Sequence, residues 1–313
     1  MTRVAVLKGG RSLERQVSLK SGARVEDALE RLGHDVVPLD VDSDLVDRLG
    51  AAGAEVAFVS LHGRDGEDGT IQELLEVMGI PYTGSGVSAC IRTADKVLAK
   101  HAMRDASIPT PDFYAFNETA FRELGAAQAL PAIEERLQFP IVVKPAGQGS
   151  ALGIKFARTP ADVPAALVAA FSYDRKVLLE RYVPGRDLAI SIIDEGDEPR
   201  ALPIVEAVPE EEEFYDFEAR YEIGRTRFVC PAELEADVAA RASELALQVY
   251  RLLGCSGFAR VDLMLEREAG GLFVLEGNTV PGLTETSLLP QAADAAGVGF
   301  DELIARILSS AGG

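Results

Sequence analysis

Residues 140–157 read PIVVKPAGQGSALGIKFA, which is a strand, a glycine-rich loop and then a second strand. The apolar run before Lys144 predicts a buried strand, and IKFA after the loop predicts another strand and not a helix. In the common nucleotide-binding folds, the glycine-rich loop leads into a helix. This segment instead predicts a hairpin whose backbone N–H groups fold over phosphates, with Lys144 adding positive charge beside them. Taken alone, the loop is equally compatible with an ordinary hairpin.

Two further segments carry polar side chains at alternate positions of apolar strands. Residues 260–263 read RVDL and residues 276–278 read EGN. Because alternate residues share one face of a strand, antiparallel pairing would place Asp262, Glu276 and Asn278 on one surface, with Arg260 beside them. Carboxylate and amide oxygens suit Mg²⁺, which also binds waters and substrate phosphates. The alternative is a salt-bridge network of Arg260, Asp262 and Glu276 on a solvated sheet face.

A lysine, a covering glycine loop and magnesium-binding carboxylates together indicate a nucleotide site and phosphoryl transfer from ATP. Other site types are absent from the sequence, which has no G-x-x-x-x-G-K-[ST] loop, no G-x-G-x-x-G entering a helix, no H-E-x-x-H and no G-x-S-x-G. His62 is the histidine that follows a strand into a glycine-rich turn. It serves either the catalytic neighbourhood or the hydrogen bonding of the turn.

The composition excludes several classes of partner. The 313 residues carry 31 Lys and Arg against 50 Asp and Glu, a net charge of −19. A chain this acidic repels nucleic acids and anionic membranes, so we expect neither as a partner. No apolar run reaches the roughly 18–20 residues that span a bilayer, and the N-terminal apolar segment is too short for a secretory signal. Three distant cysteines form neither a disulfide framework nor a zinc-ligand pattern, and the expected location is the cytoplasm.

The first part of the chain alternates strand-like and helix-like segments. Strands are predicted over 3–8, 35–39 and 55–61, and helices over 17–32 and 69–78. This alternation predicts a doubly wound parallel sheet. Ligands bind at the carboxyl ends of such strands, and those ends carry Gly9–Ser12 and His62–Gly66.

Turn-forming residues at 81–86 and 184–185 divide the chain into three predicted domains. These are an N-terminal α/β domain over 1–95, a central domain with the glycine-rich loop over 96–184, and a C-terminal domain with the magnesium site over 185–313. The central domain has predicted helices over 93–105, 128–137 and 162–171 and strands over 140–145 and 176–183. The C-terminal domain has predicted strands over 188–193, 201–206, 226–229, 259–265 and 272–275 around one helix over 232–253, which favours an antiparallel α+β arrangement. An acidic, aromatic loop, EEEEFYDFEARYEI, covers residues 210–223.

Six segments, in order, resemble D-alanine–D-alanine ligases of the ATP-grasp superfamily, and the resemblance runs nearly from end to end. They are LKGGRSLERQVSLKSG (7–22), LHGRDGEDGTIQELLEVMGIPYTGSG (61–86), VVKPAGQGSALG (142–153), FYDFEARY (214–221), GFARVDLML (257–265) and LEGNTVPGLTETSLLP (275–290). The resemblance implies an ATP-grasp fold, mixed α/β and α+β, with an N-terminal doubly wound parallel-sheet domain. It also implies an activity for peptidoglycan precursor synthesis: ATP phosphorylates the carboxylate of one D-alanine, and the amine of a second attacks the acylphosphate. Two Mg²⁺ ions, for which Mn²⁺ can substitute, and a homodimer are implied as well.

The resemblance gives roles to the residues around the first substrate. Glu14 would hold the ammonium group of the first D-alanine, with His62 close by. Glu14, Ser150 and Tyr221 match a hydrogen-bonded trio over the active site, and the loop ending at Tyr221 would be its lid. Tyr221 favours D-alanine as the acceptor, since relatives that make a D-alanine–D-lactate ester carry histidine there.

The remaining implied roles concern the oxyanion, the second substrate, the nucleotide and the metal. Arg260 and the backbone N–H of Gly282 match the group that stabilises the tetrahedral oxyanion. Ser287 and Leu288 match the residues that contact the carboxylate of the second substrate. The nucleotide residues are Lys96 and Lys144 for the phosphates, Glu180 and the backbone of 181–183, including Val183, for adenine, Asp187 for the ribose and Arg220 for the γ-phosphate. The magnesium ligands are Asp262, Glu276 and Asn278.

The sequence departs from the family pattern at several of these positions. Asp187 and Arg220 stand where Glu and Lys are common. Asp187 is one methylene shorter, which would weaken a ribose contact without removing it, and Arg220 replaces a point charge by a planar fork. Gly277 stands where a larger residue is commoner. Residues 285–286, Glu-Thr, replace the usual Ser-His beside Ser287, which leaves the fine selectivity for the second substrate open.

Two alternative functions remain at this stage. The same fold and chemistry would also serve a different acceptor, such as D-serine or D-lactate. A nucleotide-binding relative that has lost turnover is the second alternative. It would have no reason to keep the full set of functional side chains, namely Glu14, Lys96, Lys144, Arg260, Asp262, Glu276 and Asn278.

Overall fold

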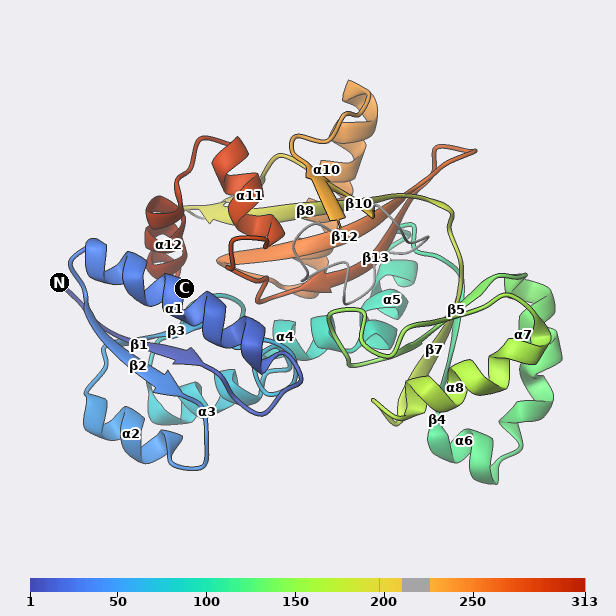
Figure 1. Ribbon diagram of the computed structural model, residues 1–313, viewed down its shortest axis with the longest axis horizontal. Coiled ribbons are helices and arrows are strands. Elements are labelled where there is room, and N and C mark those ends of the chain that lie inside the picture. The colour runs from blue at the N-terminus through green and yellow to red at the C-terminus, as the bar shows by residue number, and fades with distance from the viewer. Residues whose placement is uncertain (197, 210–225, 313) are drawn as a thin grey trace.

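The computed structural model describes residues 1–196, 198–209 and 226–312. The described chain forms three sheets that follow one another along the sequence, with helices packed against them (Figure 1). Arg220, Tyr221 and the rest of the expected lid over 210–223 lie outside the described residues. Among the described helices, none is long and apolar enough to cross a membrane. The three cysteines are free thiols, as their spacing predicts.

The N-terminal sheet is parallel, with strand order β2-β1-β3. Its elements are β1 (Arg3–Lys8), α1 (Arg15–Arg31), β2 (Asp35–Asp40), α2 (Leu45–Ala52), β3 (Val56–Val59) and α3 (Thr70–Met78). Val4 and Val6 of β1 belong to a buried cluster with α1, whereas Ala5 and Leu7 belong to another with α2 and α3. Burial on both faces explains the unbroken apolar run in the sequence. The predicted parallel sheet is confirmed, and the carboxyl ends of β1 and β3 lead directly to the site.

The central sheet is antiparallel, with strand order β4-β7-β5-β6. Its strands are β4 (Phe113–Asn117), β5 (Ile141–Pro145), β6 (Lys155–Ala157) and β7 (Lys176–Arg181). The helices beside it are α6 (Glu118–Glu123), α7 (Leu130–Leu137) and α8 (Val163–Phe171), with short 3₁₀ turns over Ala126–Ala129 and Pro160–Asp162. Because β5 pairs antiparallel with β6, the glycine-rich loop connects two neighbouring strands. The predicted strand-loop-strand hairpin is confirmed.

The C-terminal sheet has six strands, in the order β11-β10-β8-β12-β13, with β9 also paired to β8. Its elements are β8 (Gly185–Glu195), β9 (Glu198–Ala201), β10 (Val205–Pro209), β11 (Thr226–Val229), α10 (Ala236–Leu253), β12 (Phe258–Glu266) and β13 (Leu272–Asn278). All of these strand pairs are antiparallel. The predicted antiparallel arrangement around one long helix is confirmed.

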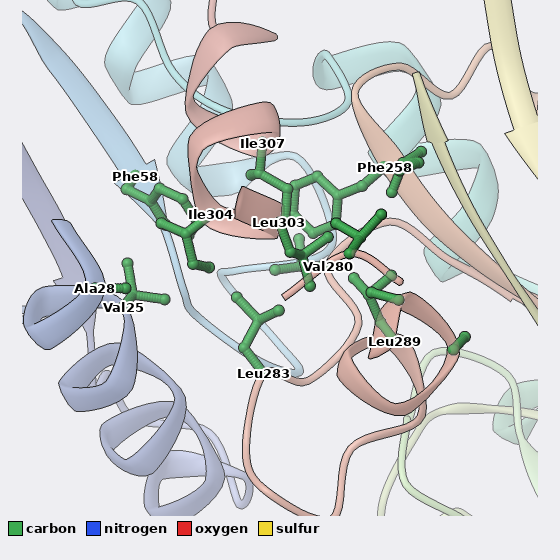
Figure 2. Packing of buried hydrophobic residues seen from close by; sticks show 14 of the residues in the cluster. Val25, Ala28, Phe58, Phe258, Val280, Leu283, Leu289, Leu303, Ile304 and Ile307 are labelled. Atoms are coloured by element: carbon green, nitrogen blue, oxygen red, sulfur yellow. The ribbon is translucent and has the colours of Figure 1, made fainter. Parts of the chain in front are cut away.

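Four helices join the sheets: α4 (Val87–Ala94), α5 (Lys96–Asp105), α11 (Leu288–Ala295) and α12 (Phe300–Ser309). Figure 2 shows Leu303, Ile304 and Ile307 of α12 between Phe58 of β3 and Phe258 of β12. One buried hydrophobic cluster therefore contains residues from both ends of the sequence. This packing holds the N-terminal sheet beside the C-terminal sheet, so that loops from both can face one pocket.

Some predicted elements were wrong. The helix expected over 93–105 is two helices that meet at Asp95, whose extended backbone and side chain cap α5 by accepting two backbone N–H groups. The strand expected over 201–206 is divided into β9 and β10, because Pro203 has no N–H for the ladder. The long C-terminal helix begins at Ala236 and not at residue 232. The sequence pattern also missed β4, α2, α4, α6, α11 and α12.

Candidate active site

Loops from all three sheets surround a polar pocket. The connection between β1 and α1, the loop after β3 and the glycine-rich loop line part of it. Strands β12 and β13 and the segment that leads to α11 line the rest. The pocket brings together ten residues singled out from the sequence: Glu14, His62, Lys96, Ser150, Arg260, Glu276, Asn278, Gly282, Ser287 and Leu288.

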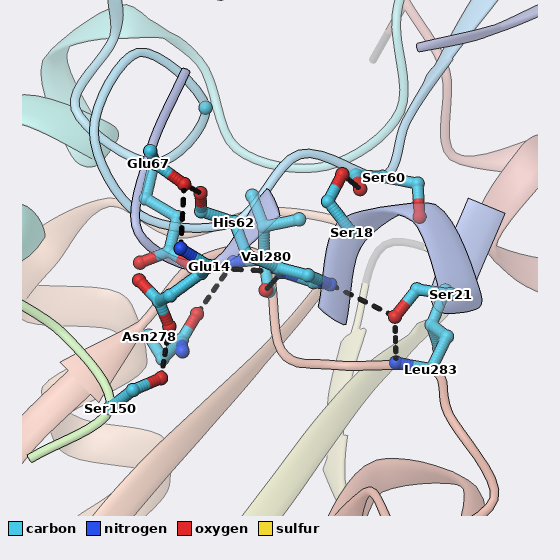
Figure 3. Close-up of polar contacts among 12 residues, drawn as sticks. Glu14, Ser18, Ser21, Ser60, His62, Glu67, Ser150, Asn278, Val280 and Leu283 are labelled. Atoms are coloured by element: carbon cyan, nitrogen blue, oxygen red, sulfur yellow. Dashed lines mark hydrogen bonds and ion pairs between the residues drawn. The ribbon is translucent and has the colours of Figure 1, made fainter. Parts of the chain in front are cut away.

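Glu14 lies at the start of α1, and only 4% of its surface is exposed. Its Oε1 accepts a hydrogen bond from the hydroxyl of Ser150 (Figure 3). Its Oε2 is buried and accepts no hydrogen bond from the described residues. A Cβ atom at Gly63 or Gly149 would lie 2.4 or 3.2 Å from this oxygen. The two glycines therefore make room for a carboxylate that has one oxygen available to a ligand.

The Glu14 carboxyl has a perturbed proton affinity. Burial raises its pKa to about 7, and the neighbouring Glu67 carboxylate acts in the same direction. Ser150, His62 and Lys96 lower the pKa but do not offset the burial. A cation bound beside Glu14 would favour the ionised form, because opposite charges stabilise one another. The site is therefore suited to a positively charged group of a ligand.

His62 connects α1 to the segment after β13. Its Nδ1 lies 3.0 Å from the carbonyl oxygen of Val280, and its Nε2 lies 3.0 Å from the hydroxyl of Ser21 (Figure 3). A carbonyl oxygen only accepts hydrogen bonds, so we assign the proton of a neutral imidazole to Nδ1. Both ring nitrogens are thus engaged by protein groups.

The expected magnesium ligands lie on one face of the β12–β13 pair. The register places Asp262 opposite Glu276 and Arg260 opposite Asn278, as antiparallel pairing predicts. Arg260 donates two hydrogen bonds to Asp262, at 2.6 and 2.9 Å, and this is the ion pair that the salt-bridge alternative expects. Glu276 lies 3.1 Å from the ammonium group of Lys96.

The donor set on this face can be compared with what a metal requires. No group of three His, Cys, Asp and Glu side chains in the described part of the chain is arranged to hold a metal by itself. The predicted set differs because its third member, Asn278, is an amide. Two carboxylates and an amide fit the oxygen donors of Mg²⁺, whose remaining positions are filled by waters and substrate phosphates.

The two lysines expected at the phosphates lie in different surroundings. Lys96 begins α5, and its ammonium group donates to the carbonyl of Gln148 at 2.8 Å, which ties the glycine-rich loop to the helix. Lys144 of β5 pairs with Glu180 of β7, whose other oxygen pairs with the fully buried Lys100. Burial lowers the pKa of Lys100 to about 8. For Glu180, the two lysines outweigh burial and hold the carboxyl pKa below its usual value.

Ser287 and Leu288 stand where α11 begins. A Cβ atom at Gly282 would lie 2.6 Å from the hydroxyl oxygen of Ser287, so glycine permits this close approach. The same oxygen accepts the backbone N–H of Thr284 at 3.0 Å. The first N–H groups of a helix lack intrahelical partners and favour anions, and the first turn of α11 holds no acidic residue. This end of the pocket suits a carboxylate.

Several predicted residues do not line the described pocket. They are Lys144, Glu180, Val183, Asp187 and Asp262, which lie on β5, β7, the turn after β7, β8 and β12. Arg220 and Tyr221 lie outside the described residues. The roles proposed for all of them stay predictions.

Three residues that the sequence reasoning did not single out lie at or beside the site. Glu67 lines the pocket, with Oε1 3.7 Å from Nδ1 of His62, and it lies inside one of the segments that carry the resemblance. Lys100 stands four residues after Lys96 on the same helix, so helical spacing could have indicated it. Ser21 gives no local signal, because its partner Leu283 is 262 residues away in the sequence.

Comparison with known proteins identifies the family. Models of the D-Ala-D-Ala ligase C-terminus and N-terminus match residues 102–309 and 46–85. A D-alanine–D-alanine ligase from Geotalea uraniireducens is 42% identical over 309 residues, covering 99% of this chain and 95% of the relative. One from Geobacter sulfurreducens is 42% identical over 311 residues, covering 99% of this chain and 94% of the relative. The chain belongs to the D-alanine–D-alanine ligase family. The predicted family and the predicted class of enzyme are confirmed.

Solved structures of this ligase family show the same architecture. A D-alanine–D-alanine ligase from Bacillus anthracis, complexed with ATP, has a TM-score of 0.83 at 32% identity, covering 99% of this chain and 97% of that one. A D-Ala:D-Ser ligase from Enterococcus faecalis has a TM-score of 0.83 at 25% identity, covering 98% of each chain. The predicted ATP-grasp fold is confirmed.

Proposed function

We propose that this chain uses ATP to join two D-alanines into D-alanyl-D-alanine for peptidoglycan precursors. The observation that carries the proposal is the buried Oε2 of Glu14, which accepts no hydrogen bond from the described residues. A buried carboxylate oxygen without a partner is unfavourable unless a ligand completes it. The ammonium group of an amino acid supplies both the donor and the opposite charge.

The first chemical step activates a carboxylate. An oxygen of the first D-alanine carboxylate attacks the γ-phosphorus of ATP, and ADP leaves. Lys96 and Lys144 offset the negative charge that gathers on the phosphoryl group, and the glycine-rich loop, tied to Lys96 through Gln148, covers the phosphates. Glu180 and Val183 hold the adenine, Asp187 holds the ribose and Arg220 contacts the γ-phosphate, by resemblance.

The metal belongs to the same step. Asp262, Glu276 and Asn278 would hold two Mg²⁺ ions, for which Mn²⁺ can substitute, and the metal supplies charge neutralisation at the phosphates when bound. In the present structure, Arg260 and Lys96 neutralise the two carboxylates.

The second step forms the peptide bond. The amine of the second D-alanine attacks the acyl carbon, and inorganic phosphate leaves with the oxygen that came from the carboxylate. Arg260 and the N–H of Gly282 stabilise the oxyanion that develops. Ser287, Leu288 and the N-terminal end of α11 hold the carboxylate of the second substrate.

An acylphosphate hydrolyses readily, so the reaction needs a closed site. In the proposal, the loop ending at Tyr221 closes over the pocket and Tyr221 joins Glu14 and Ser150. We also propose domain boundaries at 95/96 and 184/185, a homodimer and a cytoplasmic location. These last features are supported by the resemblance alone.

A product assay with several acceptors tests the proposal. The purified chain is incubated with ATP, Mg²⁺ and D-alanine alone, or with D-serine or D-lactate added, and the products are identified by mass. We expect ADP and D-alanyl-D-alanine in equal amounts from D-alanine alone. Glu14→Ala serves as the control that lacks the ammonium anchor. Turnover only when D-serine or D-lactate is added would reassign the acceptor, and no ADP from any mixture would contradict a ligase function.

A further inference from the structure

Hydrogen bonds join α1 to the segment 279–287, which we call the acceptor loop because it leads to Ser287. The hydroxyl of Ser21 accepts the N–H of Leu283 at 3.2 Å. Arg24, one turn further along α1, donates to the carbonyl of Leu283 at 2.5 Å. His62 lies between the two elements, 3.0 Å from both Ser21 and the carbonyl of Val280. Figure 3 shows Ser21, His62, Val280 and Leu283 of this network beside Glu14.

The donors and acceptors of these hydrogen bonds can be assigned in one consistent way. The N–H of Leu283 donates to Ser21, so the hydroxyl hydrogen of Ser21 is available for Nε2 of His62. The opposite nitrogen, Nδ1, donates to the carbonyl of Val280. Ser21 is 0% exposed and His62 is 4% exposed, so water cannot easily replace any of these bonds. Both imidazole nitrogens of His62 and the hydroxyl hydrogen of Ser21 therefore form hydrogen bonds with protein groups.

We propose that Ser21 and His62 are positioning residues that hold the acceptor loop against α1. The proposal rests on the function proposed above. His62 then acts through the loop, because both of its ring nitrogens are engaged by protein groups. Its two nitrogens fix the loop at Val280 and, through Ser21, at Leu283, on either side of Gly282.

This arrangement sets the distance between the two substrate sites. Glu14 and Ser21 are seven residues apart on or next to α1, which is about two helical turns. One rigid helix therefore carries both the anchor of the first substrate and the anchor of the acceptor loop. The other end of the loop is fixed at Asn278, whose side chain accepts the N–H of Val280 at 2.8 Å. A loosened loop would disturb the second step and leave carboxylate activation intact.

The variant Ser21→Ala removes the central hydroxyl of the network. We expect it to raise the KM for the second D-alanine by about tenfold, the effect of a lost buried hydrogen bond, and to change the KM for ATP by less than twofold. We also expect more ADP than dipeptide, because acylphosphate that waits for a badly placed acceptor is hydrolysed. Hydrogen exchange, measured without substrates, should show faster exchange of the Leu283 amide.

Ser18→Ala is the matched control. Ser18 is also 0% exposed on α1, but its hydroxyl bonds to the backbone of Gly9 and Ser60, which directly follow β1 and β3, at 2.8 and 2.6 Å. We expect Ser18→Ala to lose stability while keeping ADP and dipeptide equal. Ser21→Ala with equal ADP and dipeptide, an unchanged KM and an unchanged Leu283 exchange rate would overturn the positioning role. If the wild-type chain makes no D-alanyl-D-alanine in the same assay, the proposed function fails and this inference fails with it.

Discussion

The substitution Glu14→Gln tests whether the buried carboxylate of Glu14 lowers the stability of the folded chain when no cation is bound beside it. Folding raises the pKa of Glu14 from an ordinary value near 4.5 to about 7, chiefly through burial. At about 1.4 kcal/mol per pKa unit, this shift corresponds to about 3 kcal/mol. The folded chain binds the proton more tightly than the unfolded chain. The contribution to stability is therefore fully present below pH 4.5, is lost as the pH rises towards 7 and stays lost above it.

The measurement is urea unfolding of wild type and variant at about pH 5 and about pH 8, the two sides of this window, without ATP or amino acids. Glutamine is neutral at both pH values and can still accept the hydrogen bond of Ser150. We expect the stability of the variant relative to wild type to rise by up to about 3 kcal/mol from the lower to the higher pH. Glu73→Gln, at an exposed position of α3, is the control and should show no such change. The same stability difference at both pH values would refute the burial argument.

Three other substitutions test separate parts of the site. Asp262→Asn removes one charge from the proposed metal set and should lower turnover by about 100-fold or more; a near-normal rate at saturating Mg²⁺ would contradict that assignment. Gly282→Ala places a Cβ 2.6 Å from the hydroxyl of Ser287 and should raise the KM for the second D-alanine at least about tenfold. An equal rise in the KM for ATP would point to a general distortion instead. Lys100→Met removes one of the two lysines beside Glu180 but leaves the buried Glu180–Lys144 pair, so it should destabilise the chain by about 1–3 kcal/mol in urea. Adding Glu180→Gln leaves buried Lys144 without a carboxylate partner and should destabilise the chain further, by about 3–5 kcal/mol. A double variant as stable as the single one would show that packing, and not charge pairing, sets the effect.

The sequence predicted the parts of the fold that depend on local patterns. The apolar run of β1 and the strand-loop-strand pattern around residues 141–157 required no knowledge of distant partners, because burial and turn chemistry are visible in the residues themselves. Alternation along β12 and β13 placed Asp262, Glu276 and Asn278 on one face, and the register agrees. The same local reasoning failed at Asp95, where a short polar side chain ends one helix and caps the next.

The remaining features depend on packing between distant segments. The helices α11 and α12 belong to one buried hydrophobic cluster with residues of the N-terminal and C-terminal sheets, and no local pattern in the sequence predicts that contact. Ser21 lies on a helix whose sequence shows only an apolar stripe, yet its hydroxyl meets the acceptor loop. The missing hydrogen bond of Glu14 Oε2 also depends on how loops from different sheets meet. Such contacts follow from the tertiary arrangement and not from the spacing of residues.

The proposed reaction begins with transfer of the γ-phosphoryl group of ATP to the carboxylate of D-alanine. Its most direct test uses D-alanine labelled with ¹⁸O in both carboxylate oxygens, with unlabelled ATP, and measures the mass of the inorganic phosphate released. We expect one ¹⁸O atom in the phosphate for each dipeptide formed, because the carboxylate oxygen leaves with the phosphorus. Phosphate without ¹⁸O, formed together with dipeptide, would contradict the acylphosphate route.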